Sequence, residues 1–76
     1  MSLYLHTFAI NNGLLLKWKE IKEYLFAVIP GVNYIAIEMN DDVSILAVRS
    51  AANVENMILS LLRQRGLTIR FLQTHG

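Results

Sequence analysis

The chain has 76 residues, of which 54% are hydrophobic and 17% are charged. That length fits one small domain, which we expect to span residues 1–76. The sequence contains no cysteine, which excludes a disulfide framework and thiolate metal sites, and its net charge of +1 excludes the broad basic field typical of DNA-binding proteins.

Neither membrane insertion nor secretion is predicted. No apolar run approaches the ~18 residues that a membrane-spanning helix needs. The segment Met1–Leu5 lacks the basic region and the small-residue cleavage site of a secretory signal. Because a chain without cysteine suits a reducing compartment, we expect a cytoplasmic protein.

The first predicted element is a strand over Leu3–Ile10, a segment rich in apolar and aromatic residues. Alternate side chains of a strand point to opposite faces of its sheet. One set contains Leu3, Leu5, Thr7 and Ala9, and the other contains Tyr4, His6, Phe8 and Ile10. We expect the first set to face the core and the second set to face outwards.

An apolar stripe at three- and four-residue steps predicts a helix over Leu14–Ile29. Its members are Leu14, Trp18, Ile21, Leu25 and Val28. The turn that precedes it, Asn11-Asn12-Gly13, offers Asn12 as a helix cap. At the other end, Pro30-Gly31 stops the helix.

Two further strands, Asn33–Met39 and Val43–Ser50, are joined by Asn40-Asp41-Asp42, a connection short enough to predict a hairpin. Pairing Asn40 with Val43 sets the register. The aliphatic pairs Ile37–Leu46 and Ile35–Val48 then share one face, which we expect to be the core side. The pairs on the opposite face are Tyr34–Arg49, Ala36–Ala47 and Glu38–Ile45.

A second apolar stripe predicts a helix over Ala51–Arg65, with Ser50 as its cap and Gly66 just beyond its end. The members of this stripe are Val54, Met57, Ile58, Leu61 and Leu62. The last predicted strand covers Leu67–Thr74. Its inward residues are Leu67, Ile69 and Phe71, and its outward residues are Thr68, Arg70 and Leu72.

This order of elements is typical of an α+β fold, the ferredoxin-like βαββαβ sandwich, in which two helices cover one face of a four-stranded antiparallel sheet. The expected strand order is 4-1-3-2. The uncovered face would then be largely apolar, and such patches mark interaction surfaces. We therefore predict a partner-binding surface formed by Tyr4, His6, Phe8, Tyr34, Ile45, Arg49, Arg70 and Leu72.

The predicted topology also gathers several loops at one end of the sheet, close to the start of the first helix. A small anion or polar ligand could bind there, because helix N-termini attract negative charge. The candidate residues are Asn11, Asn12, Gly13, Asp41 and Asp42. Ordinary turn chemistry is the alternative explanation, since turns favour these residue types.

No catalytic residue, metal site or cofactor is predicted. His6 and His75 are the only histidines, and they lie at opposite ends of the sequence, so no i, i+4 pair exists for zinc. No serine shows a His/Asp constellation around it, and the chain has no phosphate-binding glycine loop. We therefore expect a protein that is not an enzyme.

The whole chain resembles the ferredoxin-like superfamily. The segment Ile29-Pro30-Gly31-Val32 precedes a strand, a short hairpin and the run Val43–Val48. This pattern is similar to the effector domains of feast/famine (Lrp/AsnC-type) regulators, to ACT domains and to the small maturation chaperone of periplasmic nitrate reductase. The resemblance implies a small regulatory or protein-binding module, often oligomeric and without catalysis, although the helix-turn-helix segment of the feast/famine regulators is missing.

Three functions remain open from the sequence. The first is a protein-interaction module whose sheet face binds another protein or a second copy, as in a homodimer. The second is binding of single-stranded RNA, because Leu3–Phe8 resembles the shorter motif of RNA-recognition domains, with Tyr4 in the base-stacking position. The aliphatic run Val43–Val48 departs from the longer motif. The third is an oligomeric effector domain that senses a small ligand at the Asn/Gly loops.

Overall fold

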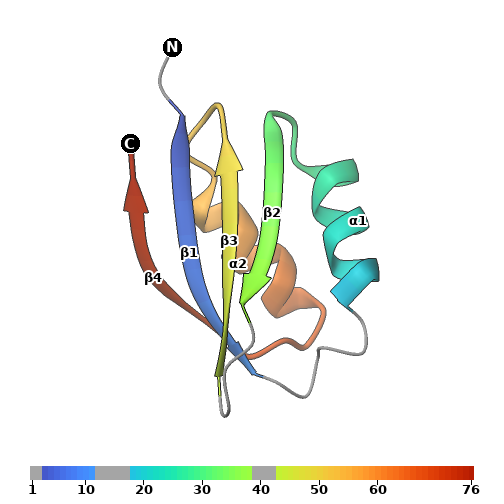
Figure 1. The fold of residues 1–76 in the computed structure, drawn as a ribbon. Coiled ribbons are helices and arrows are strands. Elements are labelled where there is room, and N and C mark those ends of the chain that lie inside the picture. The colour runs from blue at the N-terminus through green and yellow to red at the C-terminus, as the bar shows by residue number, and fades with distance from the viewer. Residues whose placement is uncertain (1–2, 12–17, 39–42) are drawn as a thin grey trace.

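The structure, a computed structural model, describes residues 3–11, 18–38 and 43–76. Within them the elements are β1 (Tyr4–Asn11), α1 (Trp18–Val28), β2 (Val32–Glu38), β3 (Val43–Ser50), α2 (Glu55–Gln64) and β4 (Ile69–His75). The described strands form one antiparallel sheet in the order β2-β3-β1-β4 (Figure 1). The predicted α+β ferredoxin-like topology and strand order are therefore confirmed.

The register of the β2–β3 hairpin agrees with the prediction at all five predicted pairs: Tyr34–Arg49, Ile35–Val48, Ala36–Ala47, Ile37–Leu46 and Glu38–Ile45. The register shifts at the start of β2, where Val32 pairs with Ser50. The predicted turn, with Asn40, Asp41 and Asp42, lies outside the described residues. A one-residue slip would turn every side chain of a strand to the opposite face, so this agreement fixes the faces of β2 and β3.

Helix α1 packs on the sheet through Ile21 and Leu25, and both are buried. Ile29, just after the helix, is also buried, and its N–H donates to the carbonyl of Leu25 at 3.0 Å. We predicted Val28 for the stripe, and that was wrong: Val28 is exposed. The buried positions follow a four-residue step, which places Val28 to the side of the stripe. The predicted member Leu14 lies outside the described residues.

Helix α2 begins at Glu55 and is shorter than predicted. Ser50 does not cap it: the position before the helix is Val54, which makes no side-chain capping bond. Val54, Ile58 and Leu62 form the buried stripe. Met57, which we predicted to belong to it, is exposed, because the four-residue step of the buried set leaves it on the flank.

The end of α2 matches the prediction at Gly66. This glycine has a φ of +81°, in the left-handed region that glycine adopts without strain. The N–H of Gly66 donates to the carbonyl of Arg63 at 3.0 Å, and the N–H of Leu67 donates to the carbonyl of Leu62 at 3.1 Å. These two bonds are the Schellman pattern that ends a helix. The Arg65 guanidinium lies 3.7 Å from the ring centroid of Tyr24, which joins the end of α2 to α1.

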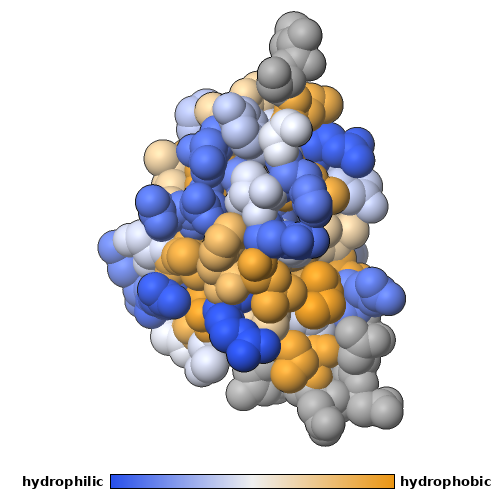
Figure 2. Space-filling view, turned by 90° about the vertical axis from the view of Figure 1, so that its left-hand side faces the viewer, coloured by the Kyte–Doolittle hydropathy of each residue, from blue (hydrophilic) through white to orange (hydrophobic). Residues whose placement is uncertain are grey.

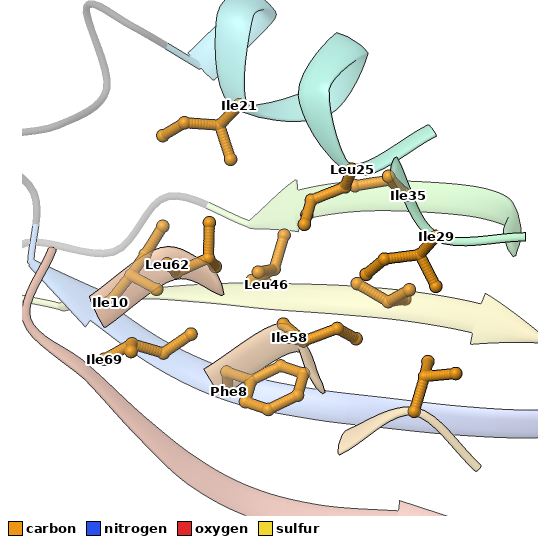
Figure 3. Close-up of a cluster of buried hydrophobic side chains, with 12 residues drawn as sticks. Phe8, Ile10, Ile21, Leu25, Ile29, Ile35, Leu46, Ile58, Leu62 and Ile69 are labelled. Atoms are coloured by element: carbon orange, nitrogen blue, oxygen red, sulfur yellow. The ribbon is translucent and has the colours of Figure 1, made fainter. Parts of the chain in front are cut away.

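The hydrophobic core fills the space between the two helices and one face of the sheet (Figure 3). Its residues are Phe8, Ile10, Ile21, Leu25, Ile29, Ile35, Leu46, Val48, Val54, Ile58, Leu62 and Ile69. Both central strands and both helices contribute to it, so the core joins the helices to one face of the sheet. Among the described residues, neither helix has the length and apolar content needed to cross a membrane.

Candidate functional site

Among the described residues, no helix covers one face of the sheet. Helix α2 passes behind the sheet (Figure 1), and the buried residues of α1, Ile21 and Leu25, join the same core as those of α2. On β3, the buried residues Ser44, Leu46 and Val48 alternate with Ile45 and Ala47, which turn away from the helices. We call this second side the open face. Through the strand register, it comprises Leu5, Thr7, Ala9, Tyr34, Ala36, Glu38, Ile45, Ala47, Arg49, Arg70, Gln73 and His75.

Cross-strand pairing orders the open face in three rows that run across the four described strands. The first row is Tyr34–Arg49–Leu5–His75, the second is Ala36–Ala47–Thr7–Gln73, and the third is Glu38–Ile45–Ala9–Arg70. The centre of the face is therefore built mainly from alanine and threonine. Larger aliphatic side chains and charged groups surround that centre.

Tyr34 and Arg49 form one corner of the open face. The Arg49 guanidinium lies 5.2 Å from the centroid of the Tyr34 ring, within the range of a cation–π attraction. Both side chains are exposed, and Tyr34 retains 46% of its accessible surface. This corner presents an aromatic ring and a positive charge together, and these residue types dominate binding energies at protein interfaces.

The structure corrects our assignment of faces on β1. His6 and Phe8 are fully buried, and Ile10 is buried as well. Phe8 pairs with Leu46 and packs edge-on against Phe71, with ring centroids 5.8 Å apart. His6 and Phe8 therefore face the helices and contribute nothing to the open face. The other set, with Leu5, Thr7 and Ala9, faces outwards.

Tyr4 also belongs to the covered side. It is half-buried, and its ring stacks on that of His6 at a centroid distance of 6.2 Å. Four predicted partner-binding residues do lie on the open face: Tyr34, Ile45, Arg49 and Arg70. Their part in binding a partner stays a prediction.

Leu72 lies at an irregularity of β4. Gln73 pairs with Thr7 and Phe71 pairs with Phe8, so Leu72 is an extra residue between the two pairs. It is exposed. Figure 2 looks onto the β4 side of the molecule and shows a band of apolar side chains below a largely polar region. Apolar surface therefore occurs along this edge as well as on the open face.

The predicted ligand site at the loops falls largely beyond what the structure describes. Asn12, Gly13, Asp41 and Asp42 lie outside the described residues. Asn11 is the last residue of β1 and pairs with Val43. No group of three or more His, Cys, Asp or Glu side chains that could hold a metal occurs in the described ranges 3–11, 18–38 and 43–76.

Sequence reasoning missed a polar cluster around His6, in the covered layer. The Nδ1 atom of His6 lies 2.8 Å from the Thr74 hydroxyl, and its Nε2 atom lies 3.1 Å from the Ser50 hydroxyl. Ser50 and His6 are fully buried. These residues come from β1, β3 and β4, so the cluster ties three strands together beside the start of α2.

Further hydrogen bonds connect this cluster to the segment before α2. The Ser50 hydroxyl donates to the carbonyl of Ala52 at 2.6 Å. The backbone N–H of Val54 donates to Nε2 of His6 at 3.4 Å. Both ring nitrogens of the buried His6 therefore have polar partners.

Burial lowers the pKa of His6 below its usual 6.5, while the Ala52 carbonyl and the charge of Glu55 act in the opposite direction. We expected no His/Asp constellation around any serine; Ser50 contacts His6, and the described hydrogen bonds of this pair include no aspartate. The pair still differs from a nucleophilic site, because the Ser50 hydroxyl is fully buried and bonded to a carbonyl. A structural role accounts for the cluster.

No protein-family model matches this chain, and a sequence search of curated proteins also gave no match. The fold therefore rests on the structure and the strand register. The resemblances drawn from Ile29–Val32 and Val43–Val48 stay predictions.

Proposed function

We propose that this domain is a non-enzymatic protein-interaction or regulatory module of the cytoplasm that binds a protein partner, or a second copy of itself, through the open face. One observation carries the proposal: in the part of the chain that the structure describes, no helix covers one face of the four-stranded sheet, yet Leu5, Ile45 and Ala47 project from it. A solvated face of an antiparallel sheet normally carries polar residues. Apolar residues there favour contact with another surface.

The arrangement of the open face suits protein contact. Its alanine-rich centre lets a partner approach the backbone closely, and its charged corners can fix orientation. Arg49 and Tyr34 supply the kind of group that is enriched where binding energy concentrates. The resemblance to feast/famine effector domains, ACT domains and the nitrate reductase chaperone agrees with a role of this class.

The open face is a better candidate than the exposed edge of β4. An edge strand can pair with an added strand through its free backbone groups. The extra residue Leu72 interrupts the regular spacing of β4, and such bulges are a common device against edge pairing. The β2–β3 and β1–β3 pairs of the open face keep a regular register through the three rows described above.

Single-stranded RNA binding receives less support. An RNA-recognition sheet stacks bases on aromatic side chains of its central strands. Here Phe8 is fully buried and Tyr4 stacks on His6 in the covered layer, so the aromatic residues of β1 are turned away from the open face. Four of the five candidate residues of the ligand-sensing alternative lie outside the described ranges, and nothing in the described residues favours it.

Site-specific photo-crosslinking tests the proposal. A benzophenone side chain replaces Tyr34 on the open face or, as a matched control, Asn56, which is exposed on α2. Each variant is irradiated in cells that produce it, and products are identified by mass spectrometry. We expect defined protein adducts from position 34 and few from position 56.

Competition makes the result specific to the face. Purified wild-type chain added before irradiation of a lysate is expected to suppress the position-34 adducts. An Ala47→Arg competitor, with a long charged side chain at the centre of the face, is expected to suppress them poorly. Equal adduct yields from both positions, or equal suppression by both competitors, would contradict the proposal.

A further inference from the structure

The charges on the open face carry an inference about its partner, which rests on the proposed function. Glu38 and Arg70 lie in the same row, joined through the pairs Glu38–Ile45, Ile45–Ala9 and Ala9–Arg70. Glu38 lies on the edge strand β2 and Arg70 on the opposite edge strand β4. Three strand spacings, about 14 Å, separate their backbones, and both side chains are exposed.

We infer that the open face binds a second copy of this chain, related by a two-fold axis that lies between the two faces and runs parallel to the strands. Such an axis reverses the order of the strands across the sheet and leaves the position of each row along the strands unchanged. It therefore places β2 of one copy over β4 of the other. Glu38 then faces Arg70 of the second copy, and Arg70 faces Glu38 of that copy.

The remaining positions fit the same arrangement. Over the middle row, Ala47 meets Thr7 of the second copy, and Ala36 meets Gln73. Small residues at this centre let two sheets pack closely. In the first row, the axis places Arg49 over Leu5 and Tyr34 over His75 of the second copy. No row sets two acidic or two basic residues directly opposite each other.

A two-fold axis perpendicular to the strands gives a poorer match. It would keep each strand over its own copy and exchange the first row with the third. Arg49 would then lie over Ile45, and Arg70 would lie over His75 of the second copy. Glu38 would face Tyr34 and the Arg49 guanidinium beside that ring, but Arg70 would have no carboxylate opposite it, so neither Glu38–Arg70 ion pair would form. Charge complementarity therefore selects the axis parallel to the strands.

Size sets the expected strength of the dimer. Four strands of about seven residues give a flat footprint of roughly 19 by 24 Å, or about 450 Å² per copy. Typical specific interfaces bury about 800 Å² per partner. Aligned sheets are also rotated by about 30° relative to each other, an offset that the long side chains of Glu38 and Arg70 can span. We therefore expect a weak, reversible dimer.

Charge reversal tests the geometry, with the purified chain studied by sedimentation velocity over a concentration series. Glu38→Arg and Arg70→Glu each place like charges together twice in the dimer. Each is expected to raise the dissociation constant at least about fivefold. The double variant restores both pairs with their signs exchanged, and its dissociation constant should return to within about twofold of the wild type. Lys22→Glu, on the exposed side of α1, is the matched control and should change nothing.

The outcomes separate this inference from the proposed function. A monomer at all concentrations overturns the second copy as partner, while adducts to a different protein at position 34 would still uphold the open face. A dimer that responds to Ala47→Arg but not to the charge reversals overturns the two-fold arrangement alone. Rescue by the double variant supports it, because only facing positions can compensate each other. Circular dichroism confirms that each variant is folded.

Discussion

The orientation of β1 decides which residues form the open face, and Phe8 tests it. Phe8 is fully buried, and its ring packs edge-on against Phe71. Phe8→Leu keeps an apolar side chain but loses this ring pair, worth about 0.5–1.5 kcal/mol, and leaves part of the ring volume empty. We expect the free energy of unfolding to fall by about 1–3 kcal/mol.

The neighbouring residue provides the control. Thr7 lies on the open face, and its hydroxyl donates to the carbonyl of Gln73 at 3.2 Å. Thr7→Val keeps the shape and the β-branched side chain, so a change within about 0.5 kcal/mol is expected. Both variants are measured by urea unfolding at low protein concentration, with the slope m checked for constancy. A loss below about 0.5 kcal/mol for Phe8→Leu would refute the assignment of faces.

Three further measurements probe other parts of the fold. Leu46→Ala, in the centre of the core, is expected to cost about 2–5 kcal/mol in urea unfolding, and a much smaller loss would place Leu46 at the surface. Gly66→Ala is expected to cost about 1–2 kcal/mol because of the φ of +81°, whereas an unchanged melting temperature would argue against the helix end described here. Because the pKa of His6 is lower in the folded than in the unfolded chain, the folded chain binds fewer protons than the unfolded chain once the pH falls towards and below 6.5. The free energy of unfolding should therefore be constant well above pH 6.5 and decline as the pH falls through it, by at most about 1.4 kcal/mol per pH unit from this residue, and His6→Gln should remove that decline.

The hairpin could be predicted because its strands have only one plausible inward set. On β3, Leu46 and Val48 alternate with Arg49, a residue that is rarely buried without a partner. Pairing them with Ile35 and Ile37 through a tight connection left one register that kept the aliphatic residues together. The order of elements could be predicted because two segments with a helical apolar stripe lie between strand segments in the sequence.

Strand β1 could not be assigned in the same way, because both of its alternating sets are apolar. His6 favoured the wrong face, since a histidine is more often found at the surface than buried. In the folded chain the cost of burying its ring is offset by hydrogen bonds to Thr74 and Ser50. These partners are 68 and 44 residues away in sequence, so no local pattern indicated them. The pairing of Phe8 with Leu46 and the full burial of Phe8 decide the face.

The corrected orientation of β1 changes the chemistry that we expect of the open face. Phe8 and Tyr4 would have offered rings that fill pockets on a partner and give tight binding. With these residues on the covered side, the centre of the open face presents Thr7 and Ala47, which contribute area but little anchoring. Specificity must then come from the periphery, where Glu38, Arg49 and Arg70 stand in solvent. Association through this face should therefore weaken as salt screens those charges, and an association that salt leaves unchanged would point to a different surface.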